Sequence, residues 1–189
     1  MQKDKRAQIL EASVHLFAER GFHATTIPMI ADQAKVGAGT IYRYFENKET
    51  LVNELFQEYI EKLKQTILNN YPPEEAEIQT KFNHLFFAMV SYAEEHLQAL
   101  YFIDSHSNNH CLDAKSLESY QSLLELFNSF IKEGQKERLI KPLPSYVLIV
   151  MVFGAFLGYY KFIQRGHFSA TDHLMDEFKK CCWDAISLH

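Results

Sequence analysis

The sequence predicts an all-α protein, and three observations carry that prediction. Glycine and proline are scarce, with 7 and 5 among 189 residues, so the chain has few of the tight turns that sandwiches and barrels need. No glycine lies between Gly39 and Gly134. Apolar residues recur at helical spacing along most of the chain, as in helices with one buried face. We therefore expect nine helices and no internal repeat.

A first amphipathic helix is expected over residues 5–20. Its apolar side chains recur every three or four positions, which places them on one face. These are Leu10, Val14 and Phe17. Gly21 then supplies the left-handed backbone position at which many helices end. The first helix is thus predicted to stop at a defined place.

Two short helices are expected next. Thr26 offers a hydroxyl that can cap the second helix, and this helix ends at residues 35–37 after barely two turns. A third helix follows over residues 38–44. On its helical wheel Ile41 faces inward, whereas Arg43 points directly away. One face of the third helix is therefore anchored, and the other is polar and basic.

Longer helices account for the rest of the chain. They are predicted at about 48–70, 76–96, 97–105, 115–138, 145–165 and 171–188. The uncharged run from Tyr146 to Tyr160 is shorter than the roughly 20 residues that span a bilayer, so we expect a buried helix and no membrane contact. Neither a signal peptide nor a framework of paired cysteines is present. A reducing, cytoplasmic location is expected.

The charge is distributed unevenly. Residues 1–48 carry seven basic and five acidic side chains, a balance of +2, whereas residues 49–189 carry 12 and 19, a balance of −7. A mildly basic head on an acidic body fits a protein that touches a polyanion at one end. We predict a domain boundary between these two segments.

The first three helices have the lengths and turn chemistry of a helix-turn-helix unit, which places its last helix in the major groove of DNA. Gly39 lacks bulk where that helix would near the duplex, and the Arg43 guanidinium can bind guanine through two hydrogen bonds. Candidate phosphate contacts are the hydroxyls of Thr40, Tyr42 and Tyr44 and the ammonium of Lys48. The head is predicted to bind double-stranded DNA.

The segment at residues 21–51 resembles the DNA-binding signature of the tetracycline-repressor (TetR) family of bacterial regulators. The matching elements are Gly21-Phe22, Thr25-Thr26, Ile30-Ala31, Ala34, Val36, Gly39-Thr40, Tyr42, Phe45, Lys48-Glu49 and Leu51. The resemblance implies a nine-helix TetR-like fold with a C-terminal ligand-binding and dimerisation domain. It also implies positioning or phosphate contacts through Thr26, Thr40, Tyr42, Tyr44 and Lys48, with Gly39 and Arg43 nearest the base edges.

Two positions depart from the family pattern. Lys35 stands where the family usually has glycine, and Gly37 stands where it has serine or threonine. The charge of Lys35 favours contact with a phosphate. Gly37 either caps the third helix more weakly than serine would, or the helix begins one residue later.

The C-terminal body is rich in aromatic residues, which can line an apolar cavity between helices or simply form its core. The candidates for a ligand pocket are Phe86, Phe87, Met89, Tyr101, Phe102, Phe127, Phe153, Phe156 and Tyr160. By resemblance to the TetR family, a small and largely apolar effector is expected to bind there.

The last two helices are candidates for a dimer interface. Gly154 and Gly158 allow another helix to approach closely, and Phe178 and Trp183 offer an apolar face. The glycines can also pack within one chain. TetR-like proteins pair these helices across a twofold axis, which sets two recognition helices about 34 Å apart on a palindrome. We therefore expect a homodimeric repressor that its effector releases from DNA.

Other classes of function are less well supported. None of the nine histidines has glutamate three residues before it, which excludes the Glu-x-x-His pairs of a di-iron bundle. The sequence also has no phosphate-binding loop and no nucleophile elbow. We expect no enzyme activity, cofactor or metal. The segment from His106 to Cys111 has spacing compatible with a metal site but is more simply a solvated loop.

The remaining alternative is a helical protein-interaction module whose helix-turn-helix does not bind DNA. The salt dependence of binding distinguishes the two hypotheses. Counterion release makes duplex affinity fall steeply as salt rises, whereas an apolar protein interface should be nearly indifferent to salt. The expected contributors to that affinity are Lys3, Lys5, Arg6, Lys35, Arg43 and Lys48.

Overall fold

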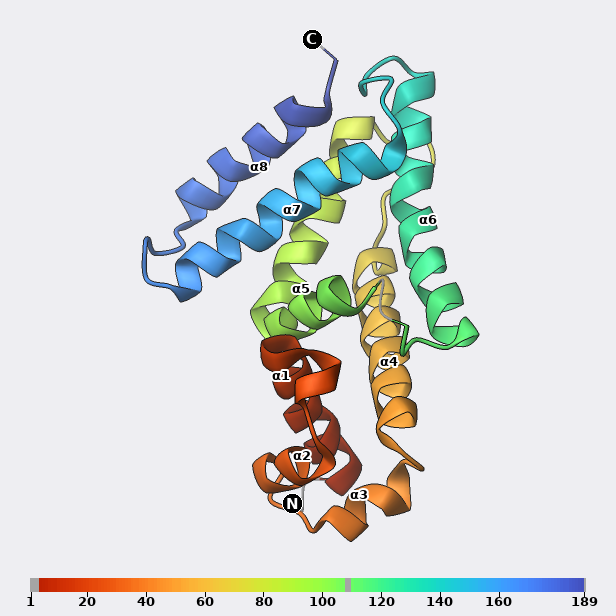
Figure 1. Ribbon diagram of the computed structural model, residues 1–189. Coiled ribbons are helices and arrows are strands. Elements are labelled where there is room, and N and C mark those ends of the chain that lie inside the picture. Colours follow the sequence, from red (N-terminus) through yellow and green to blue (C-terminus); the bar gives the residue numbers. More distant parts are fainter. Residues whose placement is uncertain (1–3, 108–109, 189) are drawn as a thin grey trace. The chain divides into compact units, whose positions relative to one another are not determined.

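A computed structural model describes residues 4–107 and 110–188, and helices account for most of them (Figure 1). The helices are α1 (Lys5–Ala24), α2 (Ile27–Gln33), α3 (Ala38–Tyr44), α4 (Lys48–Leu68), α5 (Ile78–His106), α6 (Ala114–Lys136), α7 (Ser145–Gln164) and α8 (Asp172–Ile186). The only β-type pairing in the described part is an isolated bridge between Ile140 and Ser187. The all-α prediction is confirmed.

The described residues form eight helices where the sequence predicted nine. The two stretches predicted at 76–96 and 97–105 are one helix, α5, with a kink at His96, whose φ of −136° and ψ of 35° leave the helical region. The prediction placed the break at the correct residue. The count is wrong because only one residue leaves the helical conformation, so no connecting segment separates the two parts.

The chain forms two compact units. The first contains the residues up to Thr66 together with Ser91–Ser122, and the second contains Ile67–Val90 together with the residues from Leu123 onward. Helices α4, α5 and α6 therefore each contribute to both units. Residue 48, where the charge pattern suggested a boundary, is the first residue of α4.

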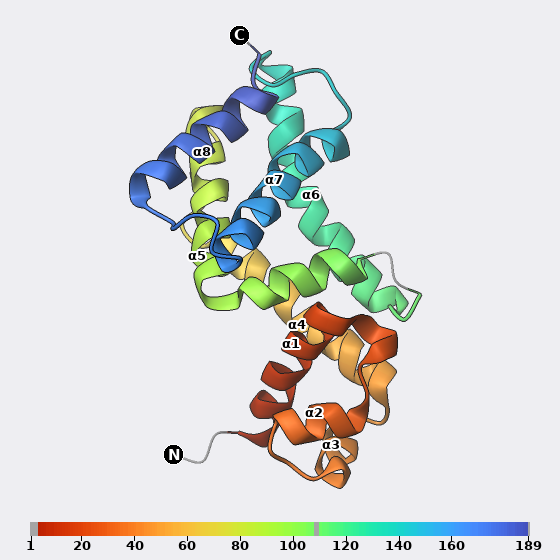
Figure 2. The same cartoon turned by 60° about the vertical axis from the view of Figure 1, so that its left-hand side comes forward.

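An aromatic cluster forms the core of the first unit, in which α1, α2 and α3 pack against one another (Figure 2). The ring of Phe17 on α1 stacks on Phe22 at a centroid distance of 6.2 Å and on Phe102 of α5 at 5.9 Å. Phe102 also meets Phe56 of α4 edge-on at 5.9 Å. The helix-turn-helix segment thus shares its core with α4 and α5.

His106 lies inside this core rather than in a solvated loop. Its side chain is 1% exposed, and its ring lies 4.6 Å from Phe102 and 6.0 Å from Phe17. The solvated-loop prediction is wrong at this residue because His106 is still part of α5, on the face that packs on α1. Asn108 and Asn109 of the same segment lie outside the described residues.

Burial of His106 predicts an acid-sensitive fold. Desolvation lowers the pKa of His106 below its ordinary 6.5, although the Phe102 carbonyl opposes that shift. The unfolded chain therefore takes up a proton at a higher pH than the folded chain, and the free energy of unfolding falls as pH drops from about 6.5 toward the folded-state pKa. Urea unfolding at about pH 7 and pH 5 should show a smaller loss for His106→Phe than for the wild type.

His96 provides the control for this comparison. Burial also lowers the pKa of His96, and the Lys62 charge adds to the effect. His96 therefore makes the wild type and His106→Phe acid-sensitive to the same extent. An equal loss of stability in the wild type and in His106→Phe would contradict the assignment to His106.

The second unit is built on α5, α6, α7 and α8, with α7 and α8 side by side (Figures 1 and 2). Aromatic contacts hold them: Tyr159 stacks on Phe178 at 4.6 Å, and Phe86 meets Phe156 edge-on at 5.8 Å. In the described residues, α7 is the one helix that is long enough and apolar enough to span a membrane. Of its most apolar stretch of 18 residues, 22% is buried. The prediction of a buried helix is therefore only partly right, because hydropathy does not say which surface covers a helix.

Candidate nucleic-acid interface

The turn between α2 and α3 sets the geometry of the helix-turn-helix. Thr26 is the N-cap of α2, and its hydroxyl accepts a hydrogen bond from the backbone N–H of Met29 at 3.4 Å. Gly37 is the N-cap of α3 and makes no side-chain cap bond. Of the two alternatives, a weakly capping Gly37 or a helix that begins one residue later, the structure has the first, and α3 begins at Ala38.

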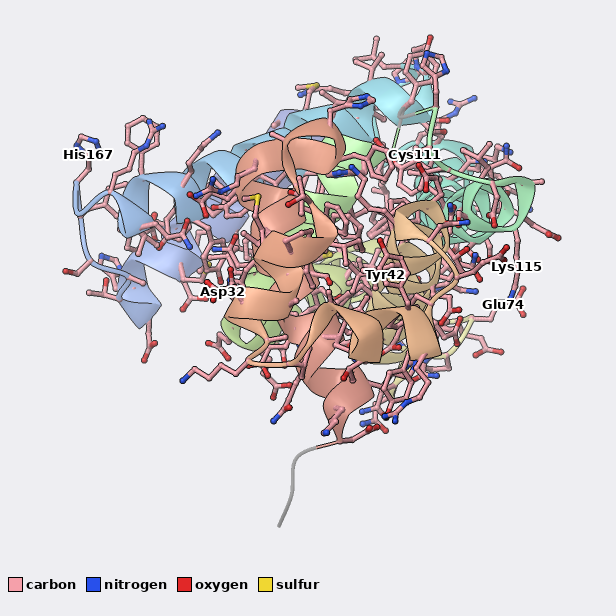
Figure 3. The ribbon with its side chains drawn as sticks, turned by 60° about the horizontal axis from the view of Figure 1, so that its bottom comes forward. Asp32, Tyr42, Glu74, Cys111, Lys115 and His167 are labelled. Carbon is pink, nitrogen blue, oxygen red and sulfur yellow. The ribbon has the colours of Figure 1, made fainter. Side chains whose placement is uncertain are left out.

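Helix α3 has one buried side and one exposed side. Ile41 is fully buried, and Phe45, which ends the helix, is 1% exposed. On the opposite side Tyr42 is 55% exposed and Tyr44 37% exposed. Figure 3 looks onto this part of the molecule and labels Tyr42. The apolar side braces α3 and leaves its polar side chains facing outward, as predicted.

Arg43 is the basic group of this outer side. Its guanidinium lies 5.2 Å from the centroid of the Tyr44 ring, and its Nη2 donates a hydrogen bond of 3.4 Å to the Tyr44 hydroxyl. Both side chains are exposed, and such a contact is weak. The guanidinium can therefore exchange this partner for a base edge at little cost.

Gly39 is not required by the fold of the chain. Its φ is not in the left-handed region, and a Cβ built at this position meets no atom within 4 Å. Glycine inside a helix costs roughly 0.5–1 kcal/mol relative to alanine. The packing of the chain therefore gives no reason for glycine on the outer side of α3, and close approach of a duplex to Gly39 remains a prediction.

Lys35 occupies a strained position in the turn. Its φ is +55°, in the left-handed region that favours glycine. The backbone N–H of Val36 then bonds the Ala31 carbonyl at 3.0 Å, which closes the end of α2. The departure from the family pattern at this position thus places an exposed lysine at a backbone conformation suited to glycine.

Replacing Lys35 by glycine should separate strain from charge. We expect Lys35→Gly to raise the free energy of unfolding by up to about 1 kcal/mol, because relief of left-handed strain exceeds the added chain entropy of glycine. Lys35→Ala keeps the strain and should show no gain. If Lys35 contacts a phosphate, both variants should reduce the salt slope of duplex binding by about one. Urea unfolding and fluorescence anisotropy measure the two effects.

Lys48 has a structural partner that the sequence reading missed. Its ammonium donates hydrogen bonds of 2.9 Å to the carbonyl oxygens of Phe22 and Thr25, and it lies 4.1 Å above the Phe22 ring. The first residue of α4 therefore holds the end of α1. An ammonium has three N–H donors, and these two carbonyls use two of them. The phosphate contact predicted for Lys48 remains a prediction and would use the third.

Arg6 ties α1 to α4 at a second place. Its guanidinium bonds the carboxylates of Glu54 at 2.9 Å and Glu58 at 3.0 Å. Although partial burial opposes ionisation, hydrogen bonds from Lys62 and Arg6 hold the pKa of the Glu58 carboxyl below its ordinary value. From the sequence, Arg6 was expected to contribute to duplex affinity. In the structure its charge is paired with two carboxylates of the first unit.

Asn53 joins α4 to the segment before α6. Its amide donates to the carbonyl of Cys111 at 2.8 Å, and its Oδ1 accepts from the N–H of Asp113 and from the hydroxyl of Ser116. Because Asn53 is 7% exposed, these bonds are shielded from water. Sequence reasoning missed this residue, since its partners lie about 60 positions away and no motif marks them.

The residues predicted to line a ligand pocket are divided between the two units. Phe86, Phe156 and Tyr160 form one aromatic row in the second unit, with Phe156 5.0 Å from Tyr160. Phe102 instead belongs to the core of the first unit, together with Tyr101. The other members in the second unit are the buried Met89, the half-buried Phe127 and Phe153, and the exposed Phe87. Their role in effector binding remains a prediction.

The residues predicted for a dimer interface fall into two groups. Gly154 is exposed, and a Cβ built at Gly154 or Gly158 meets nothing within 4 Å, so the chain's own packing explains neither glycine. Phe178 and Trp183 are half-buried and pack inside the second unit, Trp183 against Phe82 at 5.2 Å. The open face of α7 is lined by Tyr146, Val150, Met151 and Phe162, which are 41–70% exposed.

These features define a helix-turn-helix DNA-binding protein whose remaining chain is helical. Residues 9–55 match the family model described as bacterial regulatory proteins, tetR family, and residues 56–188 match the tetracyclin repressor-like C-terminal domain. The chain therefore belongs to the TetR family of bacterial transcriptional regulators, as the resemblance indicated.

Two relatives match most of the chain in sequence, and a solved structure shares its fold. The fatty acid metabolism regulator protein of Bacillus subtilis is 29% identical over 158 residues, which cover 81% of this chain and 80% of the relative. The HTH-type transcriptional regulator YhgD of the same organism is 28% identical over 155 residues, or 80% and 81% of the two chains. A TetR family transcription regulator from Marinobacter aquaeolei VT8 superposes with a TM-score of 0.83 at 22% identity, covering 98% of this chain and 96% of that one.

Proposed function

We propose that this transcriptional regulator acts as a homodimeric, cytoplasmic repressor that reads a palindromic operator and that a small, largely apolar effector releases from it. The proposal that the protein reads DNA sequence rests on the outer side of α3. There Gly39 and Arg43 are exposed above a buried Ile41, so a slim, basic surface is braced from behind. Thr26, Lys35, Thr40, Tyr42, Tyr44 and Lys48 serve as phosphate or positioning contacts.

Arg43→Ala tests base reading. We expect it to weaken binding to duplexes selected from a random pool by roughly 1–3 kcal/mol and to relax their base preference, with a much smaller loss on random duplex. Fluorescence anisotropy across a salt series measures both. Arg20→Ala, which removes an exposed arginine from α1, is the matched control. Equal losses on selected and random duplex would refute the role of Arg43.

Helix α4 is suited to carry the response to an effector. Lys48 and Arg6 fasten it to α1 at two points, so a tilt of α4 would move the helix-turn-helix with it. The paired half-sites would then lose their spacing of about 34 Å, and affinity would fall by the effector's preference for the tilted state. The fatty acid metabolism regulator among the relatives favours an effector with an acyl chain.

A second copy of the chain best accounts for the exposed apolar face of α7. Val150 is 66% exposed and Tyr146 70% exposed, whereas the neighbouring α8 carries both acidic and basic side chains and is unsuited to lipid. Pairing of α7 and α8 with their symmetry mates would bury the apolar face. Gly154 and Gly158 then allow close contact between the α7 helices.

A further inference from the structure

A cavity in the second unit stands apart from the aromatic row described above. Its volume is about 320 Å³, at the lower end of the range for small-molecule sites. It lies among the end of α4, the α4–α5 connection, the start of α5 and α6. The side chains that matter to its chemistry are Ile67, Tyr71, Lys81, Leu126, Phe130 and Glu133.

Lys81 places a buried positive charge at the wall of this cavity. Its side chain is 2% exposed, and its Nζ lies 2.6 Å from Oε1 of Glu133 and also donates to the Glu74 carbonyl. A buried ammonium is stable only with a counterion, because the solvation that it loses far exceeds what neutral groups restore. A carboxylate beside Lys81 is therefore strongly favoured over a neutral partner.

Glu133 is the more mobile partner of the pair. Its side chain is 33% exposed and belongs to the last turns of α6, so it can rotate into water while Lys81 cannot. An incoming anion can thus take the place of Glu133 at little cost. Tyr71 offers a further donor, since burial and the Glu133 charge raise the pKa of its hydroxyl and keep it protonated.

The rest of the cavity is apolar. Ile67, Leu126 and Phe130 contribute hydrocarbon surface beside the ion pair. We propose that this cavity binds a small amphiphile with one carboxylate head and a short apolar chain, whose head replaces Glu133 as the counterion of Lys81. The chain of the ligand lies along Ile67, Leu126 and Phe130.

This site connects with the proposed function, on which its regulatory meaning rests. Ile67 lies at the end of α4, a 21-residue helix whose first residue, Lys48, holds the end of α1. A helix of that length spans about 30 Å. A ligand beside Ile67 therefore contacts the same helix whose first residue holds the end of α1.

Three probes with the same eight-carbon chain test the head group by calorimetry: octanoate, 1-octanol and octylamine. We expect octanoate to bind the full-length protein at least about tenfold more tightly than octanol and octylamine to be weakest. Lys81→Met should lose that preference for octanoate. Glu133→Gln should instead tighten octanoate binding severalfold, because no charged partner has to be displaced.

Matched controls are Lys132→Met on α6 and Glu137→Gln in the turn just after it, which remove exposed charges near Glu133 in the sequence and should leave octanoate binding unchanged. If Lys81→Met does not fold, Glu133→Gln decides the question, because weaker octanoate binding in that variant overturns the exchange. Tighter binding of octylamine, or no binding of any probe, also overturns it. Octanoate binding without release of a selected duplex would keep the site and refute its effector role.

Discussion

Gly39→Leu is expected to abolish operator binding while leaving the fold intact. The chain has room for the new side chain, since a Cβ at this position meets nothing within 4 Å, and leucine is the better helix former by up to about 1 kcal/mol. On DNA the leucine would hold α3 away from the groove. We expect a loss of at least about 2 kcal/mol, because contacts worth about 1–3 kcal/mol each are displaced together.

Urea unfolding measures the stability of Gly39→Leu, and fluorescence anisotropy with a selected duplex measures its DNA affinity. His15→Leu is the matched control, because it adds the same exposed side chain on α1 and should bind DNA normally. Gly39→Ala should fall between the wild type and Gly39→Leu. Normal operator affinity in Gly39→Leu would remove α3 from the interface and leave the glycine without an explanation.

Local backbone chemistry made the helix ends predictable from the sequence. Gly21 has the expected positive φ of 74°, although it kinks α1, which continues to Ala24, instead of ending it. Thr26 caps α2 as expected. Asn47 accepts a bond of 2.7 Å from the Thr50 N–H at the start of α4. Each of these features depends on residues two to four positions apart, which is the range over which a sequence pattern carries direct information.

Partners distant in the sequence were not predictable in the same way. The spacing of apolar residues indicates which face of a helix is buried, but it does not indicate what a cation at the edge of that face will bind. Lys48 and Arg6 looked like phosphate contacts because of their charge, and each has acceptors in the first unit. Helical periodicity likewise did not place His106 in the core, since its burial depends on Phe17 of a different helix.

The same limit explains why α7 was predicted to be buried. Its apolar composition indicates that some surface covers it, without indicating whether that surface belongs to the same chain. In the structure Leu148 and Phe156 are buried, whereas Val150 and Met151 between them are exposed. Helix α7 therefore has two apolar faces, of which the chain's own core covers one, and this distinction bears directly on the oligomeric state.

Val150→Glu should convert the protein to monomers and remove operator binding. Val150 is 66% exposed, so the charge enters water in the single chain, whereas at a paired helix interface it would be buried without a partner. Because two linked recognition helices gain about 10²–10⁴ in affinity over one, monomers should bind a full palindrome and a half-site equally weakly. Sedimentation and anisotropy with both duplexes test this.

Gly154→Ile gives a second, uncharged test of the same interface. The single chain has space for a side chain at Gly154, so its stability should not fall, but a larger residue would prevent the two α7 helices from approaching closely. Lys132→Glu places a charge of the same sign at an exposed position of α6 and should leave the dimer unchanged. If Val150→Glu sediments as a dimer, the exposed face of α7 is not the interface, and operator reading by paired heads must use another surface.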